Sequence, residues 1–287
     1  MHAQNIVVRE LQEADIPGAM RLKSAENWNQ TTDDWRMLLS LDPTLCLGAF
    51  TGDRVVGTVT ATNYNNEIAW IGMMLVDQDF RGLGLGRRLL TTVIEKLSDC
   101  RSIKLDATDK GLPLYQKLGF REEQFIDRMV TPGLASALRI AGDPLIKPLT
   151  QENLPESAVL DREAFGGDRL RLFAEFLKLH PDKAWYIERE VRVSGYVLGR
   201  TGSNYTQLGP LSAEGMEDAK ALILGALKNY VGKPVVLDVL QEKKDWKELL
   251  LSLEFSVQRS FTRMYLKDSG FPASPQKQFL IAGPELG

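Results

Sequence analysis

Apolar residues in the first half of the chain recur with two different spacings. Continuous or alternating apolar runs, which are typical of strands, cover residues 5–9, 45–51, 54–62, 68–76, 102–106 and 122–130. Apolar residues three or four positions apart, which are typical of helices with one buried face, cover 15–24, 86–98 and 112–118, and a further helix begins at Thr31 or Thr32. This order predicts an α+β fold rather than a regular alternation of strand and helix.

The second half of the chain repeats features of the first half at a nearly constant offset, which indicates two homologous domains. We predict one domain at residues 1–135 and a second at 146–287, each with a mixed, mostly antiparallel sheet flanked by helices. The segment 279–283 is expected to be a last strand of the second domain or a loose tail. The matching pairs are Leu11 and Leu149, Pro17 and Pro155, Gly57 and Gly195, Gly72 and Gly209, Leu118 and Leu253, and Arg128 and Arg263.

A glycine-rich loop, residues 81–87, separates the apolar strand at 68–76 from the helix that follows it. Glycine has no Cβ, so backbone N–H groups of such a loop can turn toward one point. The N-terminus of a helix adds unpaired N–H donors and the positive end of a dipole. Together these features predict a phosphate site. The equivalent segment of the second half, 211–217, has one glycine, no arginine and two acids, so we expect it to lack this site.

Other glycine loops remain alternatives for residues 81–87, because a lone glycine pattern is weak evidence and also fits an ordinary tight turn. A dinucleotide-binding loop would follow the first strand of a parallel unit, with an acid about 20 residues later. Here a hairpin around Gly52-Asp53 precedes the strand, and Arg81 begins the loop. A nucleoside-triphosphate loop requires Gly-Lys followed by Ser or Thr, which the chain lacks at this position.

Composition narrows the class of protein further. The 287 residues are 44% hydrophobic and 25% charged, as in a soluble globular protein of two ordinary domains. A net charge of −3 argues against a general nucleic-acid binder. Two cysteines and two histidines are too few for a zinc cluster or a disulfide framework, so we expect no metal and free, buried thiols. Without an apolar run of about 20 residues, we expect a cytoplasmic monomer or homodimer with no membrane partner.

Two motifs together resemble the GNAT N-acetyltransferase superfamily. Arg81-x-x-Gly84-x-Gly86, between a strand and a helix, resembles its motif A, and the segment 114–120 resembles its later signature, in which a tyrosine lies beside the thiol of coenzyme A. The resemblance covers residues 5–130 clearly, and the repeat extends it to the rest of the chain. The chain is therefore similar to tandem two-domain members, with an active first domain and a degenerate second one.

The resemblance implies that acetyl-coenzyme A is the donor, that the acceptor is a primary amine of a small molecule or peptide, and that the amine attacks directly in a ternary complex. Backbone N–H groups of the loop would hold the pyrophosphate, and the strand before it would pair with the pantetheine arm like an added strand. Such strands usually splay here, which frees a backbone N–H to polarise the thioester carbonyl. The implied cofactor-binding residues are Met74, Leu75, Val76, Arg81, Gly82, Leu83, Gly84, Leu85, Gly86 and Arg87.

Candidate catalytic and acceptor residues follow from the same resemblance. Tyr115 would protonate the leaving thiolate, although it could instead be a packed aromatic of an amphipathic helix. Glu67, just before the central strand, is a candidate base, directly or through water. Trp28 and Asn29 lie in a loop that borders the acceptor pocket in this fold, and are candidate substrate-binding residues.

Simpler roles remain open for other residues of the first half: core packing for Trp35, a surface charge for Arg81 and a turn cap for Asp106. The alternative function for the whole chain is a non-catalytic sensor that binds coenzyme A or a metabolite.

Overall fold

The computed structural model describes residues 6–134, 145–269 and 274–287 of the chain. Its first half confirms the order of elements that the hydrophobic pattern predicts, with boundaries that shift by at most two residues. The elements are β1 (Ile6–Glu10), α1 (Ile16–Ala25), α2 (Thr32–Leu41), β2 (Leu47–Thr51), β3 (Arg54–Tyr64), β4 (Ile68–Val76), α3 (Leu85–Lys96), β5 (Ser102–Ala107), α4 (Leu112–Lys117) and β6 (Arg121–Thr131).

The second half repeats this order and ends in one additional strand. That strand, β13, is buried, so the segment at 279–283 begins as a strand rather than a loose tail. The earlier segment that it resembles, 138–142, lies outside the described residues. The elements are β7 (Ile146–Pro148), α5 (Leu154–Phe165), α6 (Leu170–Leu179), β8 (Ala184–Arg189), β9 (Arg192–Thr201), β10 (Thr206–Ala213), α7 (Met216–Leu227), β11 (Val235–Leu240), α8 (Lys244–Ser252), β12 (Ser256–Lys267) and β13 (Gln278–Leu280).

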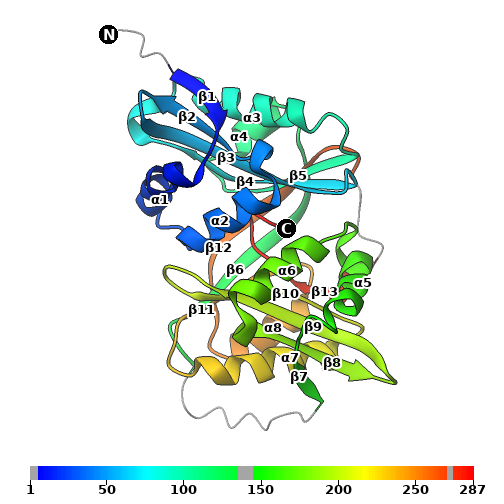
Figure 1. Cartoon of the computed structure of the whole chain (residues 1–287). Coiled ribbons are helices and arrows are strands. Elements are labelled where there is room, and N and C mark those ends of the chain that lie inside the picture. The colour runs from blue at the N-terminus through cyan, green and yellow to red at the C-terminus, as the bar shows by residue number, and fades with distance from the viewer. Residues whose placement is uncertain (1–5, 135–144, 270–273) are drawn as a thin grey trace.

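The two halves exchange their long closing strands, and this joins them into one sheet. β12 of the second half pairs antiparallel with β5 of the first half, and β6 of the first half pairs antiparallel with β11 of the second. β6 and β12 also pair with each other, so they cross the middle of the molecule side by side (Figure 1). A division between residues 135 and 146 therefore separates the halves in sequence, while each half completes the sheet of the other.

Strand β3 shows how alternating residues fill two cores of the first half. Successive side chains of a strand point to opposite faces of a sheet. Val55 packs in one core with α1 and α2, and Val56 packs in the other with Leu89 and Leu90 of α3. The core on the α1 and α2 side continues into Leu172 and Phe173 of α6, so one apolar cluster spans both halves.

The central strand β4 is interrupted where a ligand site is expected. Its parallel pairing with β5 ends at Ile71 and Leu105, and the described residues give β4 no strand partner on that side beyond this point. Its pairing with β3 shifts register between Thr58 and Thr60, and Met73 in the bulge has a positive φ of 46°. This is the splayed geometry that the family resemblance implies, and it leaves one edge of β4 open.

The structure also places the residues that composition singled out. Cys46 and Cys100 are buried and free, which confirms the expectation from their number and context, and burial raises the pKa of the Cys46 thiol to about 12. None of the described helices has both the length and the apolar character needed to cross a membrane. Within the same residues, no three His, Cys, Asp or Glu side chains are grouped as metal ligands.

Candidate active site

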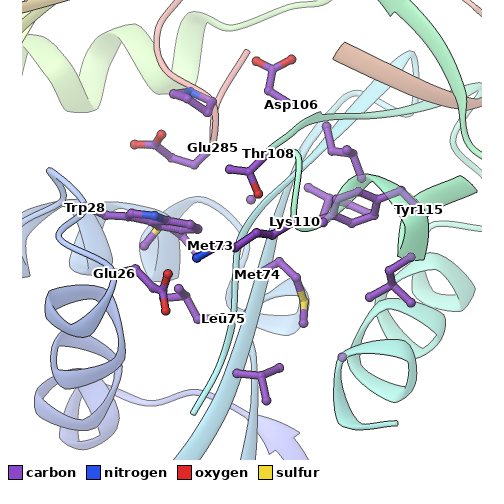
Figure 2. Close-up of a pocket in the computed structure, with 18 of the residues that line it drawn as sticks. Glu26, Trp28, Met73, Met74, Leu75, Asp106, Thr108, Lys110, Tyr115 and Glu285 are labelled. Atoms are coloured by element: carbon purple, nitrogen blue, oxygen red, sulfur yellow. The ribbon is translucent and has the colours of Figure 1, made fainter. Parts of the chain in front are cut away.

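A cavity of about 490 Å³ opens at the splayed end of β4. The glycine loop and the start of α3 line it at the Val76 end of β4, and residues from the second half of the sequence line it at the Gly72 end, where Glu285 approaches the strand. Figure 2 labels Glu285 among the lining residues. The cavity therefore requires both halves of the chain. Its lining includes Glu26, Trp28, Gly72, Met73, Met74, Leu75, Val76, Arg81, Gly82, Gly84, Leu85, Gly86, Arg87, Asp106, Thr108, Lys110, Tyr115, Arg128, Arg259, Phe261, Pro284 and Glu285.

Two glycines set the shape of the loop. Gly82 and Gly84 have φ of 78° and 76°, a left-handed conformation that a Cβ disfavours, and Gly84 is the N-cap of α3. At neither position would an added Cβ meet another atom within 4 Å, so backbone conformation rather than packing requires glycine there. The first backbone N–H groups of a helix lack helical acceptors. This loop therefore presents donors to the cavity in the way that an anion site requires.

Arg81 has protein partners in this structure. Its Nε donates to the carbonyl oxygen of Val76 at 3.1 Å, and its guanidinium forms an ion pair with Glu26 at the end of α1. These contacts hold the loop against the end of β4, and the side chain of Arg81 is still 46% exposed, so the surface-charge alternative remains open. Leu83, which was also predicted to bind the cofactor, is 68% exposed and is not among the residues that line the cavity. A phosphate contact by either residue stays a prediction.

The bulge in β4 is fixed by a buried hydrogen bond. Thr58 Oγ1 donates to the carbonyl oxygen of Met73 at 2.8 Å. The helix α3 approaches the same strand closely, since a Cβ on Gly86 would lie 3.2 Å from Cε of Met74. Met74, Leu75 and Val76 line the cavity, as predicted for the segment that would pair with pantetheine.

Tyr115 of α4 is a packed aromatic that also lines the cavity, and its role as a proton donor stays a prediction. It is 8% exposed and packs edge-on against Phe120 at 6.0 Å between ring centroids. It also lines the cavity, and Figure 2 shows its ring on the side opposite Trp28. Burial raises the pKa of Tyr115 to about 12, so its hydroxyl is protonated at neutral pH. A protonated hydroxyl at this position can donate a proton.

The two candidate acceptor residues have different positions. Trp28 lines the cavity beside Glu285 and Met73 (Figure 2). Asn29 lies outside the lining, because its side chain is buried in a contact with the second half of the chain. Its Oδ1 accepts hydrogen bonds from the backbone N–H groups of Asn204 and Tyr205, both at 3.0 Å. The substrate-binding role predicted for Asn29 is therefore replaced by an anchoring role between the halves.

Glu67 is not placed to act as the base. Its carboxylate forms an ion pair with Arg162 of α5 at 2.7 Å, and it precedes the first residue of β4. Met73 lies six residues further on, a distance of about 20 Å along a strand. Glu67 is not among the described residues that line the cavity.

Two buried ion pairs between the halves each contribute one residue to the cavity lining, Asp106 and Arg128. Arg263 of β12 makes two hydrogen bonds to Asp106, at 2.9 and 3.1 Å. Arg128 of β6 makes two to Asp238, at 2.8 and 2.7 Å. Burial raises the pKa of Asp106, although the charge of Arg263 opposes this. Asp106 therefore serves as an ion-pair partner of the exchanged strand rather than as a turn cap.

Sequence reasoning missed the contribution of residues 283–287, which lie between the halves. The carbonyl oxygen of Pro284 accepts from Trp70 Nε1 at 3.0 Å, and that of Leu286 accepts from the Tyr64 hydroxyl at 2.8 Å. A Cβ on Gly72 would lie 2.6 Å from Cα of Glu285, so glycine at this point of β4 lets the segment pass. The arginines at the matched positions 128 and 263, each inside a predicted or repeated closing strand, are a signal in the sequence of the buried ion pairs near this site.

Comparison with known protein families matches each half separately. Residues 8–120 match the model described as acetyltransferase (GNAT) family. Residues 158–280 match a different model, described as acetyltransferase (GNAT) domain. The two matches together span most of the chain and coincide with the two repeats.

Individual relatives extend over both halves. The chain is 24% identical to the uncharacterized N-acetyltransferase YitH of Bacillus subtilis, over 86% of each chain. It is 27% identical to the holothin acyltransferase of a Pseudoalteromonas species, over 75% of this chain and 72% of the relative. A crystal structure assigned as an acetyltransferase from Pyrococcus horikoshii has the same fold, with a TM-score of 0.83 and 24% identity, over 100% of this chain and 98% of that one.

Proposed function

We propose a function for this chain on the premise that it belongs to the GNAT acetyltransferase superfamily and carries two of its domains in tandem. The names of its relatives support an acyltransferase. The finer proposal is that it transfers an acetyl group from acetyl-coenzyme A to a primary amine of a small molecule or peptide, by direct attack in a ternary complex. The reaction takes place in the first domain.

One observation carries this proposal: the open edge of β4, the left-handed glycines and Tyr115 line a single cavity. The backbone N–H groups of residues 82–87 suit a pyrophosphate. The edge of β4 from Met74 to Val76 suits an extended chain that forms main-chain hydrogen bonds like an added strand. The residues present therefore fit the donor, which enters from the loop end and carries its acyl group toward Met73.

The chemistry at the bulge assigns a role to two protein groups. A backbone N–H on the open edge of β4 donates a hydrogen bond to the thioester oxygen and stabilises the charge that develops there. The amine nitrogen forms a bond to the carbonyl carbon, the carbon–sulfur bond breaks, and Tyr115 gives its proton to the sulfur. The proton lost by the amine passes to solvent, from which Tyr115 regains its own.

Release of free thiol from acetyl- and propionyl-coenzyme A across a panel of primary amines tests this proposal. We expect amine-dependent release by the full chain and a shift of its melting temperature on adding coenzyme A. The absence of any heat of binding with either acyl-coenzyme A would contradict the donor assignment. Binding without amine-dependent release from a broad panel would favour the alternative, a sensor that holds coenzyme A.

A further inference from the structure

The end of the cavity opposite the glycine loop holds a buried carboxylate with a free oxygen. Glu285 is 3% exposed, and its Oε1 forms an ion pair with Arg200. Its Oε2 is buried and has no hydrogen-bond partner among the described residues. Glu285 lines the cavity at Gly72 of β4, where its Cα and Cβ lie against the strand next to the bulge at Met73.

An arginine without an ion-pair partner lines the same end. Arg259 of β12 is half-buried, and its Nε has no hydrogen-bond acceptor within the described part of the chain. Its neighbour Arg128 is paired with Asp238, whereas Arg259 has no ion-pair partner among the described residues and only the more distant charges of Asp238 and Glu285 offset its own. Leaving a charge partly desolvated and unpaired is costly. A bound anion would remove that cost.

The charge states of these two groups favour ligand binding over proton transfer. Burial raises the pKa of Glu285, but the positive charge of Arg200 outweighs it, so the pKa is below its usual value. A carboxylate with a low pKa is a poor base and a good partner for an ammonium group. Burial and Arg128 lower the pKa of Arg259 to about 10, which leaves it charged at neutral pH.

We propose that the acceptor is a primary amine that also carries a carboxylate or phosphate group, with its ammonium group on Glu285 and its acidic group on Arg259. This inference rests on the proposed function and names the substrate class of the same site. Trp28 and Phe261 add apolar surface to the lining of the same cavity. Since Arg259 and Glu285 both come from the second half, the second domain contributes acceptor specificity to the first.

Matched acceptors test the proposal on the full chain. Thiol release from acetyl-coenzyme A is measured for α-amino acids against their amides and decarboxylated amines, and for phosphoethanolamine against ethanolamine. A site with a buried polar group discriminates strongly against analogues that leave it unpaired, so we expect kcat/KM to be about tenfold or more higher for the acidic member of at least one series. The series that shows the preference distinguishes carboxylate from phosphate.

Variants then connect that preference to the two residues. Arg259→Gln should reduce the ratio of kcat/KM between acidic and neutral acceptors to near one, while the exposed control Arg101→Gln leaves the ratio unchanged. Glu285→Gln should raise KM for the amine, and Glu285→Asp, which keeps the charge beside Arg200, should recover part of the loss. Melting temperatures of all four variants separate these effects from unfolding.

Three outcomes would overturn the inference. Thiol release without a preference for acidic amines contradicts the substrate class and leaves the acyltransferase function standing. An acidic preference that Arg259→Gln leaves intact contradicts the assigned site. The absence of thiol release with every amine contradicts the proposed function itself, and with it the inference that rests on it.

Discussion

The loop after the central strand differs between the two copies of the fold. In the first copy, eight residues lie between β4 and α3, and two of them are left-handed glycines. In the second copy, only Glu214 and Gly215 lie between β10 and α7, and Gly215 is extended with a φ of −156°. The helix starts correctly in both. The glycine turn is therefore dispensable for the fold, and its presence in the first copy points to ligand binding.

The edge of the central strand differs in the same sense. Both central strands have an irregular pairing with the strand before them. The register of β4 with β3 shifts between Thr58 and Thr60 of β3, and the register of β10 with β9 shifts between Leu208 and Leu211 of β10. Beyond the bulge β4 is open, whereas β10 pairs with β13 through Leu211 and Leu280. The chain thus places its own strand in the second copy at the position that we assign to pantetheine in the first.

The helix before the closing strand completes the comparison. At the offset of 135 residues that aligns the later parts of the halves, Tyr115 of α4 corresponds to Leu250 of α8, which is fully buried. A leucine packs as well as a tyrosine but cannot donate a proton. Each of the three features to which the proposed reaction assigns a role is therefore present in one copy and replaced by a structural substitute in the other.

Separating the two copies should have the largest effect on the stability of the fold. A fragment of residues 1–134 lacks β12, which lies between β5 and β6 in the shared sheet. We expect this fragment to show no cooperative thermal transition, and to regain one only when residues 146–287 are added. A fragment that melts cooperatively alone and binds coenzyme A would contradict the dependence of the first copy on the exchanged strand.

Weakening the packing of β13 against β10 should have the next largest effect on stability. Leu280→Ala leaves a cavity at a fully buried position, which typically costs about 2–5 kcal/mol of unfolding free energy. The control Leu83→Ala, at an exposed position of the first copy, should change stability by less than about 0.5 kcal/mol. Denaturant unfolding measures both, and equal values for the two variants would refute a structural role for β13.

Tyr115→Phe should lower kcat about 100-fold, which corresponds to about 2.7 kcal/mol, because the thiolate would then leave without a proton. The affinity for coenzyme A should change little, since the ring that packs on Phe120 is kept. Steady-state thiol release and calorimetry give the two numbers. Unchanged kcat would remove Tyr115 from the mechanism.

Gly84→Ala and Gly215→Ala form a matched pair across the copies. A Cβ at the left-handed Gly84 costs about 1–2 kcal/mol in backbone strain, so we expect the Kd for coenzyme A to rise about tenfold or more. The extended Gly215, with open space around it, should accept alanine with no change in Kd. An equal response of both variants in calorimetry would mean that the glycine turn does not hold the donor.

The smallest expected effect is that of alkaline pH on the rate of thiol release. Because burial raises the pKa of Tyr115 to about 12, its proton stays bound well above the pH at which a free tyrosine begins to lose it. The rate should therefore show no loss assignable to Tyr115 between pH 8 and about 10. The same shift means that stability from this residue declines only as pH rises from about 10 toward 12, when the unfolded state ionises first.

Local patterns in the sequence predicted the elements, the repeat and the cofactor end of the site, because apolar spacing and glycine positions act within a few residues. The exchange of β6 and β12 could not be predicted, because both closing strands have similar patterns and either can complete either sheet. The roles predicted for Glu67 and Asn29 were wrong for a related reason, because neither contact with the other half could be predicted from the sequence. Each was assigned from its place in one copy, and each is held by a residue of the other, Arg162 and the backbone of Tyr205.

The stoichiometry of acyl-coenzyme A binding tests the central claim most directly. The account assigns one open cleft to β4 and fills the equivalent cleft beside β10 with β13. Calorimetric titration of the full chain with acetyl-coenzyme A should therefore give one site per chain. Two sites, or a single site that survives Gly84→Ala and is lost in a variant of the second copy, would contradict it.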